Sequence, residues 1–147
     1  MTTFEQQIEA FKKKVEERAR LVHANATTIL QQNIIRDTPI KTGRAKANWQ
    51  ATIGEQANTA LYMANAEAGT YAPEITATVE RGKAELAYIG IDDISYITNC
   101  LTYITLLEFD AWSKQAPNGM VRINTTSEIW SNLVIPEALA KALVQVP

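Results

Sequence analysis

The sequence has one cysteine and one histidine among its 147 residues. A lone Cys100 cannot close a disulfide within the chain, so we expect a protein with an intracellular, reducing history. One cysteine and one histidine also cannot supply the usual Cys/His zinc set. We interpret His23, in the middle of a long helical pattern, as structural. The spacings of a nucleophile elbow, a zinc-protease helix and a Walker loop are absent too. The sequence therefore predicts no enzyme, no metal and no cofactor.

Two acidic features remain to be considered as chemistry. Asp92 and Asp93 are adjacent in a turn, where such pairs are usually solvated. Glu108 follows an apolar run, and no basic partner for it is evident in the sequence. An enzyme would need a pocket that gathers Glu108, Asp92 and His23.

No apolar run reaches the roughly 18 residues that a membrane helix needs. The first residues, MTTFEQQIEAF, lack the basic-then-apolar pattern of a secretion signal. We therefore expect no membrane association and no export by the usual route. A chain of this length predicts one domain spanning 1–147, large enough to bury a core without disulfides.

The charge is unevenly spread. Residues 1–50 hold nine Lys and Arg against five Asp and Glu, a net charge of +4, whereas the rest carries −6. The split is either a chance distribution over solvated faces or a molecule with a basic and an acidic side. In the second case, copies could attract one another head to tail. Overall acidity disfavours a nucleic-acid reader.

Helical spacing of apolar residues dominates the N-terminal quarter. The pattern predicts a helix over about 3–36, which at 1.5 Å per residue is longer than a small domain is wide. We therefore expect part of this helix to project and pack against a neighbour. The stripe comprises Phe4, Ile8, Phe11, Val15, Ala19, Val22, Ala26, Ile29, Leu30 and Ile34.

The remaining patterns predict a small sheet of short strands with helices packed on it, an α+β fold. Thr125 or Thr126 has the character of a helix N-cap, because Glu128 follows closely. The expected strands are 47–53, 94–99 and 120–124, and the expected helices are 73–88, 100–112, 125–134 and 136–145, with an irregular segment at 54–72.

The stretch TPIKTGRAKANW, residues 38–49, allows three interpretations. It could be a plain loop. In that case Pro39 ends the preceding helix, and Trp49 enters the core at the far end of the loop. It could be a phosphate cradle built on Lys41 and Arg44, although it lacks the Walker spacing. It could also be a contact arm for another copy of the protein.

Two stretches together resemble one protein family. TPIKTGRAKANW is similar to the "sPvdTGrlraSw" signature of the neck proteins of tailed bacteriophages, also called head–tail joining, tail-completion or minor tail proteins. YITNCLTYITLLEFDAWSKQAPNGMVRI, residues 96–123, resembles a second and more specific signature of that family. Thr102 and Asp110 depart from the common proline and glycine, so we expect a different loop shape there.

The candidate site residues in these two stretches divide into two groups. Candidate contacts with a neighbouring subunit or partner are Thr42, Gly43, Arg44, Lys46, Ser113, Lys114, Gln115, Pro117 and Arg122. Candidate structural residues are Pro39, Trp49, Asn99, Tyr103, Glu108, Gly119 and Met120.

The resemblance implies a non-enzymatic virion protein, assembled in the host cytoplasm, that forms a ring in the phage neck and leaves a channel for DNA. Its implied partners are further copies of itself, with six copies favoured over twelve, and neighbouring neck, portal or tail-tube proteins. DNA would pass without sequence-specific binding, and acidic residues on the channel wall would keep it from adhering. The alternative is a small module that uses its basic N-terminal half to bind nucleic acid or an acidic partner.

Overall fold

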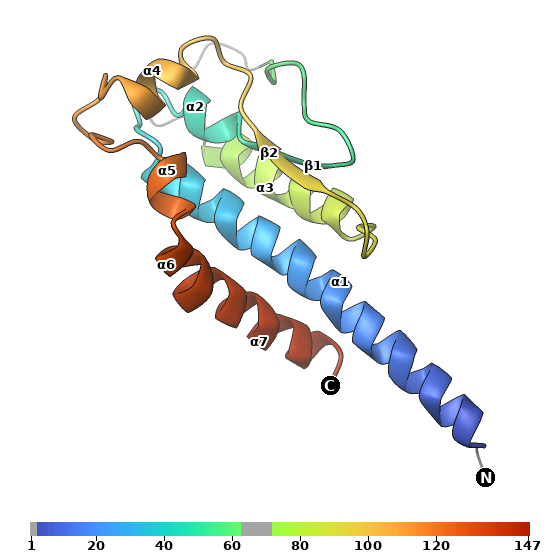
Figure 1. Cartoon of the computed structure of the whole chain (residues 1–147). Coiled ribbons are helices and arrows are strands. Elements are labelled where there is room, and N and C mark those ends of the chain that lie inside the picture. Colours follow the sequence, from blue (N-terminus) through green and yellow to red (C-terminus); the bar gives the residue numbers. More distant parts are fainter. Residues whose placement is uncertain (1–2, 63–71) are drawn as a thin grey trace.

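The computed structural model describes residues 3–62 and 72–147 (Figure 1). One long helix, α1 (Phe4–Asp37), runs through the molecule, with α3 and a small sheet packed on one part of it and α7 on another. The other elements, in order, are α2 (Arg44–Ala47), β1 (Gln50–Ile53), α3 (Ala72–Leu86), β2 (Ser95–Thr98), α4 (Ile104–Phe109), α5 (Val121–Asn124), α6 (Ser127–Ile129), the π-helical turn η1 (Trp130–Val134) and α7 (Ile135–Gln145).

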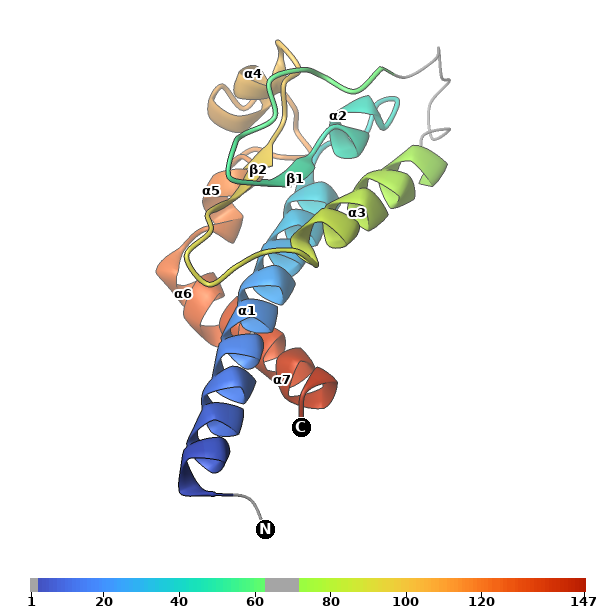
Figure 2. The same ribbon diagram turned by 90° about the vertical axis from the view of Figure 1, so that its right-hand side faces the viewer.

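Local signals at both ends fix the extent of α1 and confirm the predicted helix. Thr3 caps its first turn in a capping box, since Thr3 Oγ1 accepts from Gln6 N and Gln6 Oε1 accepts from Thr3 N. The helix ends before Pro39, which disfavours the helical region at the preceding residue. All residues from 3 to 16 are exposed, so the first half of the helix projects from the body, as Figure 2 shows.

The sheet has two antiparallel strands in the part of the chain that the structure describes. β1 pairs with β2 so that Gln50 lies opposite Thr98 and Ile53 opposite Ser95. The α+β fold with a long N-terminal helix and a small sheet is therefore confirmed. The first predicted strand was placed too early, because residues up to Ala47 form the short helix α2.

Two other predicted elements need correction. The strand predicted at 120–124 is wrong: Val121–Asn124 is the single-turn helix α5. Its first backbone N–H groups bond to the carboxylate of Glu108, so they are not available to a sheet. The helix predicted at 100–112 is only α4, and Ala111 beyond it has a left-handed φ of 48° that ends helical geometry.

The remaining predictions lie close to the observed elements. Thr126 is the N-cap of α6, with its hydroxyl accepting from Ile129 N. Residues 54–62 form no helix or strand, and the predicted irregular segment otherwise falls mostly on 63–71, outside the described residues.

The core lies around the second half of α1. One cluster joins α1 to α2, α3 and the loops of the chain's C-terminal half, and it includes Ile34, Trp49, Leu101 and Met120. A second cluster joins α1 to η1 and α7 through Ala26, Ile29, Val134 and Ala138. The tip of the molecule, around α2 and α4, lies at one end of this core, and the projecting half of α1 lies at the other end (Figure 1).

Candidate contact surface at the tip

The two stretches that carry the family resemblance lie side by side at the tip. The side chain of Gln115 bonds to both backbone groups of Ile40: Ile40 N donates to Gln115 Oε1 at 2.9 Å, and Gln115 Nε2 donates to Ile40 O at 3.2 Å. A carboxamide that binds one residue's N–H and C=O fixes the two loops in register, much as a strand would. Residues 75 positions apart are therefore held as one surface.

Thr38 and Trp49 anchor the first loop to the core. Thr38 Oγ1 donates to Ile34 O at 2.6 Å and accepts from the indole Nε1 of Trp49 at 2.8 Å. Trp49 is 5% exposed, which confirms the prediction that it enters the core at the start of the strand. The hydroxyl thus satisfies a carbonyl at the end of α1 and the one polar atom of the buried indole.

The loop between these anchors forms a compact turn and a short helix. Gly43 has a left-handed φ of 97° and precedes α2. Asn99 Nδ2 donates to Ala45 O at 2.9 Å, and Lys46 Nζ donates to Arg36 O at 3.1 Å. The loop is therefore tied both to the residue after β2 and to the end of α1.

Glu108 organises the second loop, and it has the basic partner that the sequence did not reveal. Its carboxylate accepts from the backbone N–H groups of Met120, Val121 and Arg122 at 2.6, 2.9 and 2.9 Å. Arg122 Nε also donates to it at 3.2 Å, and Arg122 Nη2 donates to the Glu108 carbonyl. The side chain of Glu108 is 7% exposed, so a buried charge is matched by a full set of donors.

The pKa of Glu108 reflects this environment. Burial of the carboxylate alone would raise its pKa, but the three backbone N–H groups and Arg122 together outweigh burial and lower the pKa below its ordinary value. Gly119 makes the close approach feasible, because a Cβ there would lie 2.6 Å from Glu108 Oε1. Glu108 is therefore a structural clamp in this loop, with its oxygens already occupied.

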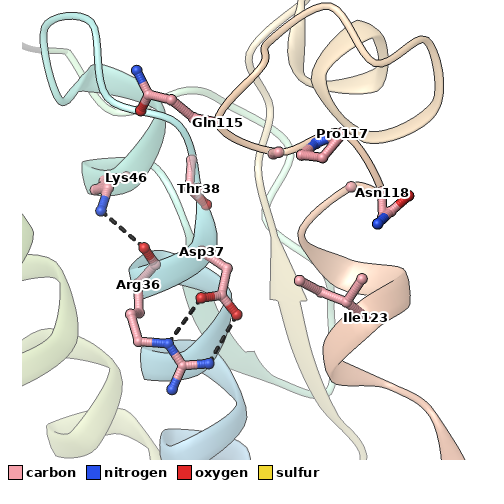
Figure 3. A pocket seen from close by; sticks show the side chains of 10 residues that line it. Arg36, Asp37, Thr38, Lys46, Gln115, Pro117, Asn118 and Ile123 are labelled. Atoms are coloured by element: carbon pink, nitrogen blue, oxygen red, sulfur yellow. Dashed lines mark hydrogen bonds and ion pairs between the residues drawn. The ribbon is translucent and has the colours of Figure 1, made fainter.

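A second carboxylate ties the end of α1 to α5. Asp37 accepts two hydrogen bonds from the guanidinium of Arg36, each at 2.8 Å, and a third from Asn124 Nδ2 at 2.8 Å. The Arg36 guanidinium, chiefly through these bonds, lowers the pKa of Asp37. Figure 3 shows this pair with Lys46 above it.

The predicted contact residues differ in how far their side chains are exposed to solvent. Those that face solvent are Arg44, Lys114, Gln115, Pro117 and Arg122; Thr42, Lys46 and Ser113 are half-buried; and Gly43 is buried. Among the predicted structural residues, Asn99 and Tyr103 are half-buried, and Pro39, Trp49, Glu108, Gly119 and Met120 are buried. The contact surface thus consists of charged and polar side chains on a scaffold that the structural residues hold.

The surface also exposes apolar side chains that the sequence analysis did not single out. Ile40, Leu106, Phe109 and Trp112 are 45%, 40%, 63% and 63% exposed. The Phe109 ring lies under the Arg122 guanidinium, whose central carbon is 5.2 Å from the ring centroid. The two aromatic residues beside turn-forming residues in FDAWSKQAP, residues 109–117, were the available signal for an exposed contact.

Two hollows border this surface. The larger, of about 790 Å³, is lined by residues 39–45 with Tyr103, Leu107, Trp112, Ser113 and Gln115. The smaller, of about 300 Å³, lies between the end of α1 and residues 115–119 (Figure 3). Residues of both resembling stretches line each hollow. A partner side chain that entered either hollow would therefore lie between the two stretches.

Among the other residues considered for chemistry, His23 and Asp93 have separate partners. His23 Nε2 lies 3.0 Å from Ser95 Oγ, and Asp93 Oδ2 accepts from Gly90 N at 2.6 Å. Both contacts lie away from Glu108, whose oxygens are occupied by its own loop. Among residues 3–62 and 72–147, no three His, Cys, Asp or Glu side chains could together hold a metal ion.

Comparison of the chain with protein-family models, with curated proteins and with solved structures gave no match. Within the described residues, none of the helices combines the length and apolar character that crossing a bilayer requires.

Proposed function

We propose that this chain is a structural, non-enzymatic virion protein of a tailed bacteriophage. It would form a ring in the neck that joins the DNA-filled head to the tail and leaves a channel for DNA. Six copies are favoured over twelve, and neighbouring neck, portal or tail-tube proteins are the expected partners.

One observation carries the proposal. The two stretches that resemble neck-protein signatures are held together by the Gln115–Ile40 bonds and form a single pre-organised surface. Gly119 and Glu108, which both match the second family signature, depend on each other there, since the glycine leaves room for the carboxylate. A signature whose members depend on one another in space is stronger support than two short sequence matches.

The character of the surface also supports a docking role. Exposed aromatic side chains beside an arginine are a composition that protein interfaces favour. The polar groups that shape the loops are bonded within the chain, so little ordering would remain to be done on docking.

The test is the mass of the purified chain in solution, followed by negative-stain imaging alone and with phage tails or portal assemblies. Rings of defined symmetry, or capture by tails or portals, are the expected result. A chain that stays monomeric and ignores both would overturn the proposal, and salt-dependent DNA binding by that monomer would favour the nucleic-acid module instead.

A matched pair of variants connects the assembly to the tip. Trp112→Ala removes an exposed aromatic side chain from the proposed surface, and Tyr88→Ala removes one that is 87% exposed beyond the end of α3. The first variant should weaken ring formation or capture at least tenfold, because aromatic anchors dominate interface energies. The second should leave both unchanged; equal effects of the two variants would show that the tip is not the contact surface.

A further inference from the structure

The projecting half of α1 carries an apolar stripe that nothing in the described chain covers. Phe4, Ile8, Phe11 and Val15 are 75%, 52%, 64% and 46% exposed, and together they follow helical spacing along about 16 Å of helix. Scattered exposed apolar residues are ordinary, but a contiguous stripe with two phenylalanines marks an interaction site.

The stripe continues a face that the chain itself covers further along. Val22, Ala26 and Ile29 lie on the same side of α1 and pack against η1 and α7. That cover ends near Arg18, whose Nε donates to Val146 O at 2.9 Å. The exposed part therefore has the composition and spacing of a helix-packing face whose covering helix is missing.

We propose that the occupant is the same segment of a second copy, lying antiparallel. When Phe4 of one helix is placed opposite Val15 of the other, Ile8 falls opposite Phe11, so the two stripes meet in four matched layers. The two-fold axis passes between residues 9 and 10. Each of the four large apolar residues of the segment therefore has an apolar counterpart.

The charges that flank the stripe select this orientation. In the antiparallel pair, Glu5 of each helix lies next to Lys12 of the other, which gives two attractive contacts by symmetry. A parallel pair would instead bring Lys12 next to Gln7 and Lys14 next to Ala19, with no opposite charges. Within one chain, Lys12 reaches Glu16 only at 3.9 Å between exposed groups, an ion pair of small value that does not compete strongly.

This isologous contact is independent of the neck proposal. It pairs copies two by two through the end of the molecule opposite the tip, whereas a ring needs a second, heterologous contact. Either contact can exist without the other.

Sedimentation of the full chain across the micromolar range tests the pairing. We expect a reversible dimer contact that Glu5→Lys or Lys12→Glu alone weakens about tenfold in dissociation constant, through two symmetric repulsive pairs. The double variant Glu5→Lys/Lys12→Glu should return close to the original constant. Glu9→Lys and Lys13→Glu make the same charge changes away from the stripe, and they should change the constant less than threefold.

A change within the stripe gives a second readout. Phe11→Ser should weaken the contact at least a hundredfold while circular dichroism shows unchanged helix content, because the side chain makes no core contact. Four results would overturn the pairing: a wild-type chain that is monomeric throughout, association that Phe11→Ser does not alter, a double variant that stays as weak as the single ones, or stripe-dependent binding to lipid vesicles by a monomer. Rings that ignore every stripe variant would leave the neck proposal standing while this one fell.

Discussion

The two ends of this molecule expose apolar side chains in opposite ways. At the tip, Phe109 projects from the end of α4 and Trp112 from the loop that follows it, and buried side chains such as Glu108 and Trp49 fix the loops around them. On the projecting half of α1, Phe4 and Phe11 project from a regular helix that has its own backbone bonds and a capping box but no tertiary cover.

The difference shows what each surface requires of the fold. A loop has no periodic hydrogen bonding, so its shape must be specified by particular long-range contacts. A helix specifies its own shape, and its surface can be bare without loss of form. We therefore expect substitutions of the buried side chains that shape the tip to change stability strongly and substitutions on the projecting half of α1 to change association alone.

The largest effect should follow Glu108→Ala. It leaves three backbone N–H groups and the Arg122 guanidinium without their shared acceptor, and we expect the free energy of unfolding to fall by about 3–5 kcal/mol. Urea unfolding measures the change. Glu9→Ala, on the projecting half of α1, removes the same group from an exposed position and should cost less than about 0.5 kcal/mol. Equal losses would remove the contrast between the two ends.

Gly119→Ala should be next in size. The φ of 80° opposes any side chain, and the added Cβ would lie 2.7 Å from the backbone oxygen of Glu108 as well as against its carboxylate. We expect a loss of about 2–4 kcal/mol in the same unfolding experiment. Gly54→Ala is the control, because Gly54 has a similar φ of 77° but open space around it. It should show only the backbone penalty of about 1–2 kcal/mol, so matching values for both variants would contradict the close approach.

A smaller effect should appear with acid. The folded-state pKa of Glu108 is below its ordinary value, so the stability it contributes is full above about pH 4.5 and is lost as the pH falls through the folded value. Asp37, the other clamped carboxylate, has a lowered pKa and shifts stability in the same direction. Thermal unfolding followed between pH 6 and pH 2 should therefore be less steep in Glu108→Gln than in wild type. Glu9→Gln should follow the wild-type curve; a parallel Glu108→Gln curve would show that the clamp is not linked to protonation.

Sequence reasoning recovered what local pattern determines. The long helix was predicted because apolar spacing and Pro39 are local signals, and the two real strands were found within a few residues. The false strand at 120–124 arose because five residues with three apolar side chains are too few to distinguish a short strand from a helical turn. The deciding contact comes from Glu108, twelve residues earlier, and no local pattern reveals it.

The same limit applies to the two surfaces. The resemblance named the residues of the tip, but the Gln115–Ile40 bonds that unite them join residues 75 positions apart in the sequence. On α1, periodicity shows which face is apolar, and the prediction that part of the helix projects came from its length. Which half is exposed depends on where α7 ends along α1, and only the tertiary structure shows that.

The smallest effect, and the sharpest use of the comparison, is Ile8→Ala. In dilute solution, where copies are apart, it should change the free energy of unfolding by less than about 0.5 kcal/mol, because Ile8 is 52% exposed and lies beyond the core. Ile29→Ala deletes the same atoms from the same face of the same helix, but Ile29 is 4% exposed against α7, so this control should cost about 2–5 kcal/mol. Raising the protein concentration should increase the free energy of unfolding of the wild type more than that of Ile8→Ala, since association adds stability only where the stripe is intact. If the two free energies of unfolding stay equal at every concentration, the projecting face has no partner in a second copy, and its apolar stripe serves a different contact.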